Sequence, residues 1–312
     1  MQKNDFPTLR APKRCALAHD LSGVGRCALT VAIPTLAAMG IQPCPAPTGV
    51  LSTHTGGYTG MAVRDLSDYL EENLDHWESM GMTFDAIYSG YLCHERQQAV
   101  LSRFIERQRA LGCKLVVVDP VLGDDGELYQ KLTSRTVSAM AALVREADII
   151  TPNLTEAALL LGIPYAPGTP ESARTYELLA ALTELAPCVV LTGAMGAGTH
   201  QTLAMRRGDV GYWACEYRHV DAVYPGTGDL FTSVITGALL NGQVLPRALE
   251  VATWFVGEAV RFTRLLDTQA REGVALEPLL PLIMGNWAQG EEAMLHRPAS
   301  SPVPRARWVP RG

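Results

Sequence analysis

Short apolar runs alternate along the chain with longer segments in which apolar residues recur every three or four positions. The runs have the length and composition of buried strands, and they span residues 14–19, 45–52, 84–92, 113–120, 147–153 and 188–193. The periodic segments have the pattern of helices with one buried face, and they span residues 26–39, 66–77, 95–111, 132–146, 155–162, 171–185, 227–241 and 246–268. Strands that alternate with helices predict a mainly parallel sheet covered by helices on both faces.

Three local features modify this pattern. The stretch "SGVG" at 22–25 predicts a glycine turn after the first strand. Pro34 predicts a kink or an interruption in the first helix. Residues 199–219 predict a β-hairpin whose turn lies near the sequence "RGD" at 207–209.

The last part of the chain has no hydrophobic period. From about residue 286 the sequence is rich in proline and arginine, as in "HRPASSPVPRARWVPRG". Such a composition predicts a flexible tail. We therefore expect one domain over residues 1–285 and a tail over residues 286–312.

Composition and charge narrow the class of protein. The 312 residues are 47% hydrophobic and 19% charged, which is ordinary for a soluble globular protein with a sizeable core. The net charge of −6 disfavours wholesale binding of nucleic acid. Seven cysteines without a C-x-x-C pair indicate buried thiols in a reducing compartment. No signal peptide and no membrane span are recognisable, so the expected location is the cytoplasm.

Polar residues fall repeatedly at the carboxyl ends of the predicted strands. In open parallel sheets these ends meet at one edge, where ligands bind. Turns also favour aspartate, so one such residue is weak evidence, but five strand endings carry them. The residues concerned are Asp20, Thr53, His54, Asp119, Asn153, Glu156, Thr192 and Gly193.

The stretch "GTGD" at 226–229 has the composition of an anion site. Gly226 and Gly228 allow a tight turn with exposed N–H groups, and the helix that starts there adds unpaired donors and a positive dipole end. This combination suits phosphate. Asp229 would then accept the proton of an attacking hydroxyl, or it would simply cap the helix.

Several separated blocks resemble one known family. The "GTGD" block, "VVVDPVLGDDG" (116–126) and "ADIITPNLTEAALLLG" (147–162) resemble the ribokinase-like superfamily. Within it, "STHTGGY" (52–58) and "IYSGYL" (87–92) resemble the pyridoxal/pyridoxamine kinase branch. The opening block, residues 19–40, is similar to bacterial pyridoxamine kinases. The resemblance covers about residues 13–285, with the blocks in the family's order.

The resemblance implies a fold, a reaction and its partners. The fold would be a three-layer α/β/α sandwich with a mostly parallel central sheet and a small β flap. The reaction would be ATP-dependent phosphorylation of the 5′-hydroxymethyl group of pyridoxamine, pyridoxal or pyridoxine, which salvages vitamin B6. ATP and Mg²⁺ would be required, a monovalent cation such as K⁺ is left open, and the protein would form a homodimer.

The resemblance also implies roles for particular residues. Asp229 would be the base, and the amides of Gly226, Thr227 and Gly228 would stabilise the transferred phosphoryl group. Glu156 and Asp119 would serve Mg²⁺. The expected ATP site comprises Asp119, Asp124, Asn153, Thr192, Gly193, Gly226 and Gly228. The expected substrate site comprises Asp20, Ser22, His54 and Thr55.

Simpler structural roles stay open for some of these residues. Glu156 would also suit the first turn of a helix, and Ser22 the cap of the first one. His54 would also suit a structural loop, and Asp124 with Asp125 a plain turn.

The substrate and the class of function stay open as well. The sequence His19-Asp20 departs from many pyridoxal kinases, which carry serine there, and is closer to hydroxymethylpyrimidine kinases. A hydroxymethylpyrimidine kinase is therefore the nearest alternative. A non-catalytic vitamin B6 carrier on the same fold is another, although binding alone needs no base. A nucleotide-binding regulator with an active tail is the third.

Overall fold

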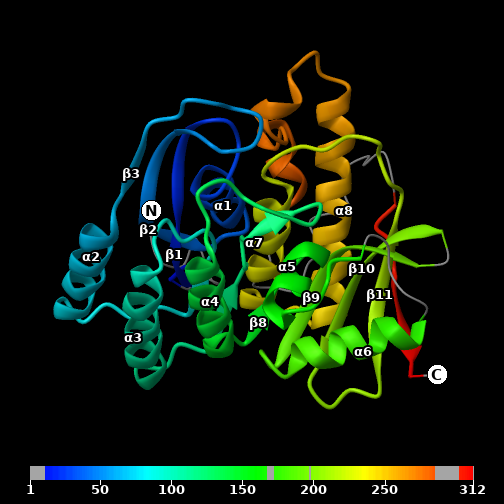
Figure 1. Cartoon of the computed structure of the whole chain (residues 1–312), viewed down its shortest axis with the longest axis horizontal. Coiled ribbons are helices and arrows are strands. Elements are labelled where there is room, and N and C mark those ends of the chain that lie inside the picture. Colours follow the sequence, from blue (N-terminus) through cyan, green and yellow to red (C-terminus); the bar gives the residue numbers. More distant parts are fainter. Residues whose placement is uncertain (1–10, 167–171, 197, 285–301, 312) are drawn as a thin grey trace, which may run out of the picture.

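A single mixed sheet organises the chain (Figure 1). The computed structural model describes residues 11–166, 172–196, 198–284 and 302–311. In this part of the chain ten strands form the sheet in the order β12-β11-β10-β9-β8-β5-β4-β1-β2-β3. The strands are β1 (Arg14–Val24), β2 (Gln42–Thr53), β3 (Val63–Asp65), β4 (Ala86–Ser89), β5 (Leu115–Val118), β8 (Ile149–Ile150), β9 (Cys188–Gly196), β10 (Thr199–Arg206), β11 (Gly211–Tyr217) and β12 (Ala306–Pro310).

Helices cover both faces of the sheet, as the alternating pattern predicts. One face carries α1 (Leu29–Ala38), α7 (Thr227–Leu240) and α8 (Leu245–Arg264). The other carries α2 (Ser67–Ser79), α3 (Arg96–Ala110), α4 (Ser134–Leu143), α5 (Leu154–Leu161) and α6 (Ser172–Thr183). Buried strands supply both cores, because successive side chains point to opposite faces. In β9, for example, Val189 and Leu191 belong to one core and Val190 to the other.

The central strands are parallel and the edges are antiparallel. β2, β1, β4, β5, β8 and β9 pair in parallel, so their carboxyl ends share one edge of the sheet. β3 joins the β2 edge antiparallel, and β10, β11 and β12 extend the β9 edge. The expected hairpin over 199–219 is therefore confirmed as β10 and β11. The expected α/β sandwich is also confirmed.

Short elements complete the described part of the chain. A separate two-stranded sheet consists of β6 (Gly123–Asp124) and β7 (Glu127–Leu128). Three 3₁₀ turns are η2 (Val144–Glu146), η3 (Ala270–Glu272) and η4 (Glu277–Leu282). No helix of the described residues combines the length and the apolarity needed to cross a membrane.

One local expectation at the start of the chain was wrong, and another was wrong in part. The strand β1 continues to Val24 and pairs with β2 to its end, so "SGVG" is mostly strand, and only Gly25 has a positive φ of 89°. The register of β1 against β2 shifts between His19 and Leu21, just beyond Ala18, the last residue of β1 that pairs with β4. Helix α1 continues through Pro34, because its apolar side chains are buried against the sheet and α7, so the expected interruption was wrong, while a kink stays a prediction.

The end of the chain forms an edge strand. Residues 306–310 lie in the range expected to be a flexible tail, yet they form β12 and pair with β11. Trp308 packs edge-on against Trp213 at 5.3 Å, and the N–H of Ala306 donates to Glu250 at 3.0 Å. The expectation is thus corrected for these five residues, because an edge-strand partner far away in the sequence supplies the order. Residues 285–301 lie outside the described part, and the domain boundary at 285 stays a prediction.

Candidate active site

A cavity of about 530 Å³ opens at the carboxyl edge of the parallel strands. This volume is typical of a small-molecule site. Residues of β1 and β9, the loops after β1, β2, β5 and β8, and the first turn of α7 line it, so the predicted strand endings converge. The predicted site residues that line it are Asp20, His54, Thr55, Asp119, Asp124, Asn153, Glu156, Thr192, Gly193, Gly226, Thr227, Gly228 and Asp229.

The two glycines of "GTGD" lie in different surroundings. Gly226 is the N-cap of α7 with a φ of 84°, and a Cβ there would stand 2.2 Å from the carbonyl oxygen of Arg26. A Cβ on Gly228 would meet no atom within 4 Å, because this residue faces open space in the cavity. The first turn of α7 therefore presents unpaired amides to an open site, which suits a phosphate group.

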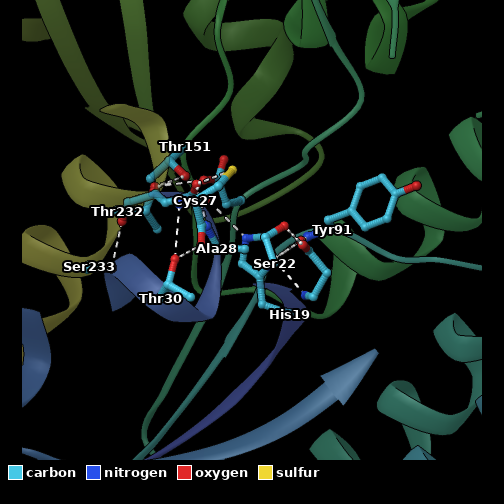
Figure 2. A network of polar contacts seen from close by, with 12 residues as sticks. His19, Ser22, Cys27, Ala28, Thr30, Tyr91, Thr151, Thr232 and Ser233 are labelled. Carbon is cyan, nitrogen blue, oxygen red and sulfur yellow. Dashed lines mark hydrogen bonds and ion pairs between the residues drawn. The ribbon is translucent and has the colours of Figure 1, made fainter. Parts of the chain in front are cut away.

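The carboxylate of Asp229 is held by three donors from the β1–α1 region. Figure 2 labels the residues that supply them, His19, Cys27 and Ala28. Its Oδ2 accepts from the N–H of Ala28 at 2.7 Å and from the thiol of Cys27 at 3.2 Å. Its Oδ1 accepts from Nε2 of His19 at 2.9 Å. The carboxylate thus binds a neighbouring loop, while the N-cap of α7 is a glycine without a side chain. Helix capping does not account for Asp229.

These contacts keep Asp229 ionised. Burial alone would raise the pKa of Asp229, but the hydrogen bond and the charge of His19 outweigh it and lower that pKa below its ordinary value. A buried carboxylate that stays ionised can accept a proton.

His19 joins two acidic residues, and the sequence patterns did not single it out as a site residue. Its Nδ1 lies 3.0 Å from Oδ1 of Asp20, and the His19 residue is only 2% exposed. Burial would lower the pKa of His19, but the hydrogen bonds to Asp20 and Asp229 and their charges raise it to about 10. The available signal was the "HD" pair at the end of a strand, which was noted only as a departure from related kinases.

Ser22 supports this pair from outside the cavity. Its hydroxyl donates to Oδ2 of Asp20 at 3.0 Å, and Ser22 does not line the cavity. The N-cap of α1 is Ala28, so capping by Ser22 was a wrong alternative. Direct substrate contact by Ser22 is not supported either. Its observed contact is with Asp20, which does line the cavity.

Asp119, directly after β5, lies in a different environment from Asp229. Its Oδ2 accepts from the hydroxyl of Thr232 at 3.1 Å, and Thr232 also contacts Thr151 at 2.9 Å. Burial and the charge of Asp229 raise the pKa of Asp119 to about 7. Neither threonine was foreseen, because nothing in the local sequence links Thr151 to a residue on α7.

Glu156 forms a reciprocal cap with Asn153 at the start of α5. The side chain of Asn153 accepts from the N–H of Glu156, and Oε2 of Glu156 accepts from the N–H of Asn153, each at 2.9 Å. The structural alternative for Glu156 is thus confirmed. Its Oε1 accepts from the N–H of Leu122 at 3.2 Å. Burial and the charge of Asp119 raise the pKa of Glu156 well above its ordinary value.

The donor set fits a cation that keeps its own waters. Two buried carboxylates, Asp119 and Glu156, face one cavity and have raised pKa values because burial and neighbouring negative charge disfavour their ionised forms. Among the described residues, no group of three or more His, Cys, Asp or Glu side chains could hold a metal by themselves. Mg²⁺ typically uses one or two carboxylates with phosphate oxygens and water, which these residues can supply.

Asp124 lies on the small β6–β7 hairpin. Asp125 and Gly126 form its turn, both with positive φ, and Oδ1 of Asp124 accepts from the N–H of Asp125 at 3.0 Å. The plain-turn alternative is therefore confirmed for this pair. Asp124 nevertheless lines the cavity, so its role toward ATP stays a prediction.

His54 uses both ring nitrogens within the protein. Its Nδ1 accepts from the N–H of Gly56 at 3.0 Å, and its Nε2 donates to the carbonyl of Arg271 at 2.8 Å. Burial lowers the pKa of His54, which is consistent with a neutral ring. These bonds support the structural-loop alternative, and they leave only the ring face for the predicted contact with a substrate.

Apolar side chains also line the cavity. Thr192 and Gly193 of β9 line it too, with the N–H of Thr192 donating to the carbonyl of Pro152 at 3.0 Å, and their role toward the nucleotide stays a prediction. The segment after β11 and the end of α8 add side chains that the sequence did not single out. They include Val220, Val223, Val256 and Val260.

Comparisons with known proteins identify the family. The family model "Phosphomethylpyrimidine kinase" matches residues 29–273. The pyridoxine/pyridoxal/pyridoxamine kinase of Bordetella avium is 33% identical over 76% of this chain and 81% of its own length. The crystal structure of pyridoxal kinase from Lactobacillus plantarum superposes with a TM-score of 0.80 at 37% identity, over 87% of this chain and 96% of that one.

A Bacteroides thetaiotaomicron structure assigned to the phosphomethylpyrimidine kinases, in a crystal form with pyridoxal, gives a TM-score of 0.83 at 41% identity. It too covers 87% of this chain and 96% of its own. The fold and the site thus define a ribokinase-like protein. The chain belongs to the phosphomethylpyrimidine and pyridoxal kinase family, which confirms the resemblance seen in the sequence.

Proposed function

We propose that this protein transfers the γ-phosphoryl group of ATP to the 5′-hydroxymethyl group of a vitamin B6 vitamer. The observation that carries the proposal is Asp229, a buried carboxylate kept ionised beside a glycine turn at the open end of a helix. A base next to a phosphate site is the arrangement that phosphoryl transfer to an alcohol requires. The Bordetella avium relative is named as a pyridoxine/pyridoxal/pyridoxamine kinase, and the Lactobacillus plantarum structure as a pyridoxal kinase.

Each group of residues has a proposed part in the reaction. Asp229 accepts the proton of the substrate hydroxyl, whose oxygen attacks the γ-phosphorus while ADP leaves. The amides of Gly226, Thr227 and Gly228 stabilise the charge on the transferred group. Mg²⁺, held by Asp119 and Glu156, would neutralise phosphate charge. The substrate ring lies toward Asp20, His54 and Thr55, and the nucleotide toward Asp124, Asn153, Thr192 and Gly193.

A hydroxymethylpyrimidine kinase remains the second candidate. The description of the matching family model favours it, whereas the Bordetella and Lactobacillus relatives and the pyridoxal-bound Bacteroides structure favour vitamin B6. These substrates share a hydroxymethyl group on a nitrogen heterocycle and differ in ring substituents. One polar contact can decide between such substrates. A non-catalytic carrier is disfavoured, because binding alone gives no reason for a buried ionised base.

Turnover with a panel of alcohols tests the proposal. ATP consumption and the phosphorylated product are measured with pyridoxal, pyridoxine, pyridoxamine and hydroxymethylpyrimidine, each with and without Mg²⁺. We expect the highest kcat/KM with a vitamin B6 vitamer. Preference for hydroxymethylpyrimidine would establish the second candidate, and no turnover with any of the four would overturn both. The homodimer, the cytoplasmic location and the use of K⁺ stay predictions.

A further inference from the structure

We propose that His19 is the positioning residue of the active site: its Nε2–H fixes the one oxygen of Asp229 that is free to receive the substrate proton. This inference rests on the proposed function. The evidence comes from the acceptor capacity of Asp229, the confinement of the imidazole and the backbone around it.

The acceptor capacity of Asp229 is nearly used up. A carboxylate offers about two acceptor sites on each oxygen. Both sites of Oδ2 are occupied, by the N–H of Ala28 at 2.7 Å and the thiol of Cys27 at 3.2 Å. One site of Oδ1 is occupied by Nε2 of His19 at 2.9 Å. The remaining site is therefore on Oδ1, and a substrate hydroxyl that binds there becomes a neighbour of the imidazole.

His19 carries a proton on Nε2 in either of its plausible states. Nδ1 lies 3.0 Å from a carboxylate oxygen of Asp20, and the backbone N–H of Tyr91 points at it from 3.3 Å. The ionised carboxylate of Asp229 can only accept, so Nε2 carries the proton of the 2.9 Å bond, and if Nδ1 also donates to Asp20 the ring is doubly protonated. If Nδ1 accepts from Tyr91, the single proton is on Nε2. Asp229 receives a hydrogen bond in both cases.

Gly90 provides the space for the imidazole. A Cβ at this position would stand 2.1 Å from Cδ2 and Nε2 of His19, which no side chain can tolerate without moving the ring. A substitution at residue 90 therefore tests how the position of the His19 ring affects the reaction. An alanine there keeps the chemistry of His19 and changes only its position.

The backbone near the His19 ring also supplies a donor to the carboxylate of Asp229. Ala28 has a φ of 54°, a left-handed conformation that non-glycine residues rarely adopt, and its N–H is the donor to Oδ2 of Asp229. Opposite sides of the carboxylate are therefore fixed by a strained amide and by His19. Both donors come from residues 19–28, and both reach Asp229 in the first turn of α7.

Removal of the imidazole should affect the chemical step more than nucleotide binding. His19→Ala should lower kcat for a vitamer by about 10- to 100-fold, the range seen when a residue that orients a reactive group is lost. The KM for ATP should stay within about twofold, because the hydrogen-bond partners of His19 are Asp20, Asp229 and Tyr91, none of which is proposed to bind the nucleotide. His19→Gln, whose amide can reach Asp229 with an N–H, should recover most of the lost kcat. His76→Gln, on the exposed surface of α2, is the matched control.

Gly90→Ala supplies the decisive comparison. It should reproduce the loss of kcat seen in His19→Ala, and it should add little in the double variant, because the ring it displaces is already absent. Losses that multiply in the double variant would overturn the proposal. So would a normal kcat in a folded His19→Ala protein, or equal losses in His19→Gln and His19→Ala. A circular-dichroism melt of each variant reports whether it is folded.

A spectroscopic readout separates this inference from the proposed function. Protein labelled with ¹⁵N-histidine should show a slowly exchanging ring N–H that vanishes in His19→Gln and shifts in Asp229→Asn. Absence of this signal would overturn the positioning role, even in an active kinase. If the signal is present but the wild-type protein phosphorylates no vitamer, the proposed function fails while the contact between His19 and Asp229 stands.

Discussion

Two neighbouring aspartates of the cavity have opposite electrostatic environments. Asp229 has a lowered pKa, because the hydrogen bond and charge of His19 outweigh its burial. Asp119 has a pKa raised to about 7, because burial and the charge of Asp229 act on it without a comparable donor. A difference of this kind assigns different tasks to chemically identical side chains. It supports Asp229 as the base and Asp119 as a partner for positive charge.

The first prediction concerns pH and the buried histidine. The folded-state pKa of His19 is about 10, above its ordinary value of 6.5, so its ion pairs stabilise the protein fully below pH 6.5 and lose this effect as the pH rises through about 10. The melting temperature of the wild type should therefore exceed that of His19→Gln by less at pH 10.5 than at pH 6.5.

The groups around His19 allow this comparison. Asp20 and Asp229 contact it, and Tyr88 lies edge-on at 6.2 Å. Burial raises the pKa of Tyr88 well above its ordinary value, and burial does the same for the nearby thiol of Cys27. A difference in melting temperature that is constant over this pH range would contradict the raised pKa of His19.

The second prediction separates the two roles of Glu156. Glutamine retains one oxygen, which can accept the N–H of Asn153, so Glu156→Gln should preserve the cap of α5. The N–H of Leu122 would lose its acceptor, so the melting temperature should fall while the protein stays folded. The lost charge should weaken the hold on Mg²⁺ and raise the Mg²⁺ concentration needed for half-maximal turnover. A titration of turnover with Mg²⁺ measures this. An unchanged midpoint would leave Glu156 with its capping role alone.

At the scale of helices and strands, the sequence predicted those elements whose hydrophobic pattern lies within the element itself. The helix predicted over 95–111 is observed as α3 at Arg96–Ala110, because its apolar spacing determines the buried face. β12 was not predicted, since its order depends on β11, which is about 90 residues away. The extension of β1 was missed for the same reason: its last residues are held by pairing with β2.

The third prediction concerns β12. Removal of residues 302–312 should expose the edge of β11 and the face of Trp213, and so lower the melting temperature. In proteins of this size each 1 kcal/mol corresponds to about 2–4 °C. Turnover of the folded variant should stay within about threefold of wild type. A melting temperature equal to that of the full chain would contradict a stabilising role, and abolished turnover in a folded variant would favour a regulatory tail.

At the scale of the whole molecule, the fold brings residues about 200 positions apart into one site. The strand endings were predictable, because parallel strands place their carboxyl ends at one edge of the sheet. The contacts of Asp229 with Cys27 and Ala28 were not, since they depend on how α7 lies against the start of α1. Sequence reasoning thus located the cavity and the proposed base, while the groups that hold this carboxylate required the structure.

The central claim is that Asp229 is the proton acceptor of a vitamin B6 kinase, and Asp229→Asn tests it most directly. Asparagine keeps an oxygen for the N–H of Ala28 but cannot take the proton. Asp125→Asn, on the exposed turn of the β6–β7 hairpin, is the matched control. We predict that Asp229→Asn remains folded, retains ATP binding and loses roughly 10²-fold or more of its turnover with pyridoxal, while the control is unaffected. Near-normal turnover in a folded Asp229→Asn protein would contradict this account.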